Sequence, residues 1–308
     1  MLSGEWVDDV TSASMQKNGN WTRTPSVVRN WIAEDAAEFT PVAGRYHLYA
    51  AWNCPWAHRV VLTRALLGLE AALPVSFAAP VRTDEGWVFE PKTEYCDALF
   101  GHRALHQVYA SGDAAYTGRV TTPLLFDTKR QRLVSNESAD LVRMLPVAFA
   151  EFASLPHDFY PAAQRADIDY WNDRIYPKLN NGVYRAGFAE SQKAYELAVG
   201  EVFETLDAIE DRLAVSRYLA GDSLTEADIR LFPTLARFDV AYFTAFKCSR
   251  RRIVDYPHIW RYARNFYARP GVAQTVAFDI YRRGYSSQSD KRNPLGIVPI
   301  APAIDWSL

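Results

Sequence analysis

The chain has 308 residues, of which 49% are hydrophobic, 14% aromatic and 23% charged, with a formal net charge of -2. Because no surplus of basic residues exists to neutralise phosphates, nucleic acid is not expected as a partner. No stretch approaches the roughly 20 consecutive apolar residues of a membrane span. Three widely spaced cysteines (Cys54, Cys96, Cys248) form neither a disulfide framework nor a metal-binding motif. A cytoplasmic protein with free thiols, no metal and no membrane partner is predicted.

The first forty residues are expected to form an ordered but irregular N-terminal extension. They are polar, contain no apolar signal core and show no regular period. Three tryptophans, Trp6, Trp21 and Trp31, stand among them, and tryptophan side chains are costly to leave in water.

A strand followed by a helix is predicted next. The segment 45–50 alternates as a strand does and leads into a turn at Asn53-Cys54. Pro55 suits the first position of the following helix, where its missing N–H costs nothing, and Gly68 is a typical helix stop.

The elements that follow complete an α/β pattern. A second strand is expected at 73–77, then a long polar insertion at about 79–118 that we read as a loop. Strands at 121–127 and 132–134 form a hairpin, and "SNESADLVRML" opens another helix. The order strand, helix, strand, long loop, strand, strand, helix predicts a thioredoxin-like domain over residues 41–150.

Residues 160–275 are predicted to form an all-helical domain. "SLTEADIRLF" contains a capping box formed by Thr225 and Asp228. Residues 276–308 are expected to be a tail packed on the body. An apolar stripe with helical spacing supports the helical domain; it consists of Ala198, Val202, Leu206, Ile209 and Leu213.

Cys54 is the candidate nucleophile. Backbone N–H groups and the positive end of the dipole at a helix N-terminus favour thiolate over thiol. Ala57 stands where a CxxC motif would place its second cysteine, so Cys54 needs an external thiol such as glutathione to finish a turnover. A buried structural cysteine is the alternative from position alone. His58, one turn later, is interpreted as a partly buried, hydrogen-bonded histidine.

The chain resembles the glutathionyl-hydroquinone reductases, also called Xi-class glutathione transferases. The resemblance implies a thioredoxin-like domain that binds glutathione, then an all-helical glutathione-transferase domain, and it implies a homodimer. The motifs that carry it, in chain order, are "NWTRTPSVVRNW", "RYHLYAAWNCPWAHR", "GWVF", "GRVTTP", "SNESADLVRM", "NNGVYRAGFA", "LTEADIRLF", "RFDVAYFTAFKC" and "NPLGIVP".

The resemblance also implies catalytic and glutathione-binding residues in the first domain. Cys54 is the nucleophile, and Thr122-Pro123 is a cis-proline turn whose first residue pairs through its backbone with the cysteinyl part of glutathione. Thr122 replaces the valine expected there, which is harmless if only the backbone is used. An ordinary trans proline is the alternative.

Four further residues match positions near glutathione. Glu137 and Ser138 open a helix whose N-terminus suits the γ-glutamyl carboxylate, although Ser138 could simply cap that helix. Trp87 in "GWVF" and Arg119 in "GRVTTP" complete the set, Arg119 being apt for a carboxylate. Without the resemblance they would be read as a core tryptophan and a surface arginine.

Tyr184 and Tyr285 match the two tyrosines that face the aromatic substrate. Phenol hydroxyls can hydrogen-bond a quinol oxygen while the rings pack on its face, and plain packing is the alternative. The segment "YSSQSDKRNP" lacks the histidine expected shortly after Tyr285, which bears on substrate preference.

The predicted activity is glutathione-dependent reduction of S-glutathionyl-hydroquinones through a mixed disulfide between Cys54 and glutathione. Two alternatives stay open. One is an omega-like thiol transferase or dehydroascorbate reductase, which would not need Tyr184 and Tyr285. The other is a non-enzymatic binding module, which would not need a reactive thiol in "NCPWAH".

Overall fold

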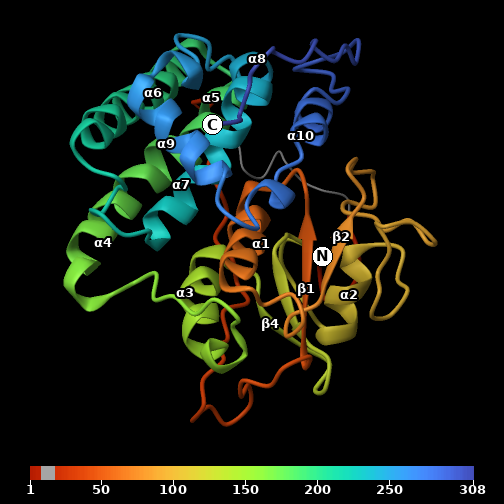
Figure 1. Ribbon diagram of the computed structural model, residues 1–308. Helices are drawn as coiled ribbons and strands as arrows, with labels where there is room; N and C mark the ends of the chain where they lie inside the picture. Colours follow the sequence, from red (N-terminus) through yellow and green to blue (C-terminus); the bar gives the residue numbers. More distant parts are fainter. Residues whose placement is uncertain (8–17) are drawn as a thin grey trace. The chain divides into compact units, whose positions relative to one another are not determined.

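The computed structural model describes residues 1–7 and 18–308 (Figure 1). Chain contacts divide the protein into two compact units, Met1–Val10 with Pro25–Asp158 and Thr11–Thr24 with Phe159–Leu308. Part of the expected N-terminal extension, residues 8–17, lies outside the described residues. Residues 18–40 contain no helix or strand, as expected, but Arg29 forms an isolated antiparallel bridge with Ser135. Trp21 is buried, but Trp31 is 43% exposed, so burial of all three tryptophans was a wrong expectation.

The first unit is built on a four-stranded sheet with the order β2-β1-β3-β4. Strand β1 pairs in parallel with β2 and antiparallel with β3, which confirms the thioredoxin-like fold. Its strands and α-helices, in chain order, are β1 (Tyr46–Ala51), α1 (Pro55–Leu67), β2 (Val75–Ala78), α2 (Leu105–Gly112), β3 (Leu124–Asp127), β4 (Arg132–Ser135) and α3 (Ser138–Ala148).

Strand β1 and helix α1 place Cys54 at a fixed point. All six residues of β1 are buried, as expected for a central strand covered on both faces. The chain turns after β1 and enters α1 through Pro55. Gly68 ends the helix in the left-handed region, with φ of 62°, and its N–H bonds the carbonyl of Ala65. The predicted start and stop of this helix are both confirmed.

The long insertion after β2 is not a structureless loop, because it contains α2. Leu105, Val108 and Tyr109 are buried on one face of this helix at helical spacing. The expectation of a loop was therefore wrong: two turns of apolar periodicity are present but are short within a polar stretch.

The second unit is helical (Figure 1). Helix α6 packs against α5 and α9, and it carries the predicted buried stripe. None of the described helices is long and apolar enough to cross a bilayer. Its α-helices are α4 (Arg165–Ile175), α5 (Gly182–Gly187), α6 (Gln192–Val215), α7 (Glu226–Arg237), α8 (Phe243–Ala245), α9 (Pro257–Tyr267) and α10 (Phe278–Tyr285); π-helical segments η4 (Tyr176–Asn180) and η5 (Phe238–Tyr242) precede α5 and α8.

The capping box at the start of α7 forms as predicted. The N–H of Thr225 donates to Asp228 Oδ2 at 2.9 Å. Beyond α9, the segment expected to be a tail begins with a regular helix, α10, in which Tyr281 is buried. Helix α10 is what positions Tyr285.

Candidate active site

Cys54 is the N-cap residue of α1. Its Sγ accepts the N–H of Ala57 at 3.4 Å, and its thiol lies 3.2 Å from the carbonyl oxygen of Thr122. The side chain is 9% exposed. The sulfur therefore lies at the N-terminal end of the helix, between a backbone N–H and a backbone carbonyl.

The Thr122–Pro123 peptide bond is cis, as the resemblance implied. The carbonyl of Thr122 faces Cys54, whereas the N–H of Thr122 donates to no group in the described part of the chain. A backbone donor left open beside a thiol suits the carbonyl of an extended peptide ligand.

The start of α3 differs in detail from the expectation. Glu137, not Ser138, is the N-cap: its Oε1 accepts the N–H of Ala139 at 2.9 Å. Ser138 is buried, and Arg59 Nη1 lies 3.5 Å from its hydroxyl oxygen. Arg59 belongs to α1 and is 1% exposed, so a buried cation lies beside the end of α3 that is expected to bind a carboxylate.

Trp87 and Arg119 are both half-buried. The Trp87 ring has the Arg82 guanidinium 5.3 Å from its centroid, and the Trp87 carbonyl accepts the N–H of Leu105 at 2.8 Å. The Arg119 carbonyl accepts the Tyr116 hydroxyl at 2.9 Å. Trp87 is therefore not fully buried, and its contact with glutathione stays a prediction.

Tyr109, on α2, connects two loops of the first unit. Its hydroxyl donates to the Thr121 carbonyl at 2.8 Å and accepts Asn136 Nδ2 at 3.1 Å. Burial raises the pKa of Tyr109, which keeps the phenol neutral. Tyr109 thereby holds the segment of Thr122 close to that of Glu137. Sequence reasoning missed both Tyr109 and Arg59.

In the second unit, Tyr184 and Tyr285 are brought together. Their hydroxyl oxygens lie 2.6 Å apart, although the residues are far apart in sequence. A third tyrosine, Tyr242 of η5, lies with its hydroxyl 3.3 Å from that of Tyr285. Tyr242 was not predicted, because in "RFDVAYFTAF" it reads as one of several core aromatics.

Aromatic rings and cations surround this tyrosine trio. Trp21, Phe188 and Phe246 have ring centroids within 5.1 to 6.2 Å of Tyr184. The Arg23 guanidinium lies 5.3 Å from the centroid of the Tyr184 ring, and that of Arg292 lies 4.2 Å from the centroid of the Phe188 ring. The three hydroxyls are therefore enclosed by aromatic rings, and two guanidiniums lie against those rings.

Burial raises the pKa of Tyr242 and Tyr285 well above the usual value of a phenol. The buried guanidinium of Arg237 acts in the opposite direction on both hydroxyls, but burial dominates. Both phenols therefore stay neutral at neutral pH and remain hydrogen-bond donors.

His58 is 3% exposed, consistent with its interpretation as a buried histidine.

Two family models match the chain: "Glutathione S-transferase, N-terminal domain" over residues 53–147 and "Glutathione S-transferase, C-terminal domain" over residues 192–265. Glutathionyl-hydroquinone reductase YqjG of Escherichia coli strain K12 is 42% identical over 98% of this chain and 94% of its own length. Glutathionyl-hydroquinone reductase PcpF of Sphingobium chlorophenolicum is 44% identical over 98% and 96%.

Among solved structures, glutathione-bound YqjG superposes with a TM-score of 0.87 at 44% identity, covering 90% of this chain and 94% of the YqjG chain. The match therefore includes both units and nearly every residue. The chain belongs to the glutathione transferase superfamily and, within it, to the Xi-class glutathionyl-hydroquinone reductases.

Proposed function

We propose that this protein reduces S-glutathionyl-hydroquinones to hydroquinones at the expense of glutathione. The observation that carries the proposal is the position of Cys54: a single thiol at the N-terminus of α1, 3.2 Å from the carbonyl of a cis X–Pro segment. The relatives YqjG and PcpF bear the name of this activity, and the solved structure of YqjG contains glutathione.

In the first step, the Cys54 thiolate attacks the sulfur of the glutathionyl-hydroquinone. A sulfur–sulfur bond forms and the bond from sulfur to the ring carbon breaks. The electron pair of the broken bond stays on that carbon, which takes a proton and becomes the C–H of the hydroquinone. Cys54 and glutathione are left as a mixed disulfide.

In the second step, the thiolate of another glutathione attacks the glutathione sulfur of the mixed disulfide. Oxidised glutathione leaves, and Cys54 returns as a thiolate. Ala57 occupies the place of a resolving cysteine, so the external thiol is required. The substrate ring is reduced and two glutathione sulfurs are oxidised, which balances the reaction.

Glutathione would be held by the residues of the first unit. The open N–H of Thr122 and the Thr122-Pro123 turn suit its cysteinyl backbone. Glu137 and Ser138 lie at the end of α3 with the buried cation Arg59, a position that suits the γ-glutamyl carboxylate. Trp87 and Arg119 are proposed to complete the binding set.

Tyr184 and Tyr285 are proposed to orient the quinol. A pair of phenols 2.6 Å apart, of which Tyr285 is kept neutral by burial, can donate a hydrogen bond to a quinol oxygen and pass a proton to the ring carbon. Tyr242 extends this chain of hydroxyls. An omega-like thiol transferase would have no use for such a chain, because a small disulfide has no ring oxygen to bind.

We also propose that the protein is a cytoplasmic homodimer. The three cysteines are free, which fits a reducing compartment. A dimer would show as twice the 34.9 kDa chain mass in light scattering at micromolar concentration.

Mass spectrometry tests the proposed reaction. Glutathionyl-menadiol and glutathione should yield menadiol and oxidised glutathione, and with glutathionyl-menadiol alone one glutathione should remain attached to Cys54. Cys96→Ser is the matched control, because Cys96 is also a free cysteine but is not part of the site. An adduct on Cys96, or no adduct during active turnover, would contradict the mechanism.

A further inference from the structure

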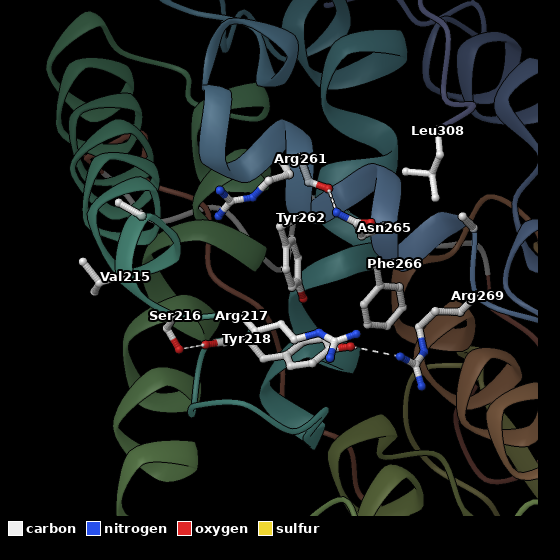
Figure 2. A pocket seen from close by; sticks show the side chains of 12 residues that line it. Val215, Ser216, Arg217, Tyr218, Arg261, Tyr262, Asn265, Phe266, Arg269 and Leu308 are labelled. Carbon is white, nitrogen blue, oxygen red and sulfur yellow. Dashed lines mark hydrogen bonds between the residues drawn. The ribbon is translucent and has the colours of Figure 1, made fainter.

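A cavity of about 530 Å³ lies in the second unit (Figure 2), and its lining includes no member of the tyrosine trio. Its walls come from residues 214–218, where α6 ends, from α9 and the two residues that follow it, and from Leu308. Cavities of this size hold small organic molecules in other proteins. None of the residues proposed for glutathione or the quinol belongs to its lining.

Three of the lining side chains are arginines: Arg217, Arg261 and Arg269. Across the described residues, no carboxylate forms an ion pair with any of the three, and no Asp or Glu belongs to the lining. Elsewhere in the same unit Arg252 and Arg282 pair with aspartates at 2.8 and 2.5 Å. The lining therefore holds three guanidiniums and no Asp or Glu side chain.

Two of these guanidiniums meet at one phenol. Arg269 Nη1 donates to the Tyr218 hydroxyl at 2.9 Å, and the Arg217 guanidinium carbon lies 5.5 Å from the centroid of the Tyr218 ring. Figure 2 shows Arg269 pointing toward this hydroxyl and Arg217 running along the ring. Both guanidiniums contact the same tyrosine, and an anion bound beside them would be attracted to both and offset their mutual repulsion.

Arg269 also has an unused donor. Its Nε is buried and has no hydrogen-bond partner in the described part of the chain. A buried donor without a partner is unfavourable, and an oxygen of a bound carboxylate would satisfy it. By contrast, Arg261 Nη2 already donates to the carbonyl of Leu213 at 2.6 Å, so part of its fork is occupied.

Three further lining residues are aromatic. The Tyr218 and Tyr262 rings pack edge to face with centroids 6.3 Å apart, and the Tyr262 and Phe266 rings are tilted with centroids 5.9 Å apart. The Tyr262 hydroxyl donates to buried Asp228 at 3.0 Å, so it is already engaged by the protein. Ring faces of this kind suit a flat aromatic ligand.

We propose that this cavity binds a small aromatic carboxylate. The carboxylate accepts hydrogen bonds from Arg217 and Arg269, and the ring packs on Tyr218, Tyr262 and Phe266. The site is separate from the glutathione and quinol sites and does not depend on the proposed reaction.

The probe is 1-naphthoate, and binding is measured by isothermal titration calorimetry on the whole protein. We expect saturable binding of one molecule per chain, unchanged when glutathione is saturating. Arg269→Gln and Arg217→Gln should each weaken it about tenfold to hundredfold, as expected for losing a hydrogen bond to a charged group. Arg269→Lys keeps the positive charge but not the forked pair of guanidinium donors, so its affinity for 1-naphthoate should lie between those of the wild type and Arg269→Gln.

Arg132→Gln is the matched control. Arg132 is exposed and lies on β4 of the first unit, and its replacement removes the same charge as the cavity variants do. This control should leave binding of 1-naphthoate unchanged, which would show that the cavity variants do not act through the net charge of the protein. Thermal unfolding of each variant verifies that it is folded. Equal binding by all variants, displacement of 1-naphthoate by glutathione, or equal affinity for neutral 1-naphthalenemethanol would each overturn the proposal. Binding of inorganic phosphate as tight as that of 1-naphthoate would overturn recognition of the ring.

Discussion

Around Cys54 the important contacts come from the backbone, whereas around Tyr285 they come from side chains. The Cys54 sulfur meets the N–H of Ala57 and the carbonyl of Thr122. The Tyr285 hydroxyl meets two other phenols, Tyr184 and Tyr242. A backbone environment survives changes of side chain as long as the fold holds, but a hydroxyl network loses a member with every substitution. The first region is therefore expected to set the reaction, and the second the substrate.

The largest expected effect comes from Cys54→Ser. A serine hydroxyl is a poor nucleophile toward sulfur and cannot form the mixed disulfide. Turnover of glutathionyl-menadiol and of a small disulfide, bis(2-hydroxyethyl) disulfide, should both vanish. Thermal unfolding should change little, since the replacement is similar in size. Residual activity with either substrate would show that another group performs the attack.

Next in size are the tyrosine variants. Tyr285→Phe and Tyr184→Phe should lower turnover of glutathionyl-menadiol by roughly tenfold to several-hundredfold, as when a hydrogen bond used in the transition state is removed. Tyr285→Phe should be the more severe, because its hydroxyl lies near both other phenols. Steady-state rates with both substrates give the measurement.

Reduction of bis(2-hydroxyethyl) disulfide should hardly change in these variants, since that chemistry needs only Cys54 and the glutathione site. Tyr170→Phe is the control: Tyr170 is 57% exposed on α4 and outside the trio. Equal losses on both substrates would indicate general damage or a thiol transferase. If neither substrate is affected, the tyrosines are packing residues and the quinol assignment fails.

The same division explains how far the sequence could be read. The start and the end of α1 were predictable because Pro55 and Gly68 act locally, at the two ends of the helix itself. The pairing of Tyr184 with Tyr285 was expected from the resemblance alone, because local sequence rules do not connect two residues that lie far apart in the chain. Local rules alone would have left both as core aromatics.

What escaped prediction depends on contacts between distant segments. Arg59 on α1 has the residue type of an exposed position, and only the packing of the first unit shows that it is 1% exposed beside Ser138. Tyr109 acquires its role from two loops that lie after it in the chain. Helix α2 was missed because its apolar periodicity spans only two turns.

A smaller effect is expected at the turn beside Cys54. Thr122→Val restores the residue expected by resemblance and keeps the backbone. The Thr122 hydroxyl is buried and has no hydrogen-bond partner in the described part of the chain, so the protein loses no bond with it. Turnover with both substrates should stay within about twofold, and stability should be equal or slightly higher. A large loss would show that the hydroxyl itself contacts glutathione.

The smallest effect concerns pH. The ratio of the turnover rates of the two substrates cancels every pH dependence that the two reactions share. What remains is the tyrosine trio. Burial raises the pKa of Tyr285 and Tyr242, and a phenol with a raised pKa keeps its proton to higher pH than a free phenol. The ratio of glutathionyl-menadiol to disulfide turnover should therefore stay constant between about pH 7 and 9, below the ordinary phenol pKa of about 10.

A fall of the ratio in that interval would mean that the buried cation Arg237, which favours the ionised phenols, outweighs burial. The hydroxyl network would then carry a negative charge, and its role in binding the quinol would be that of an acceptor.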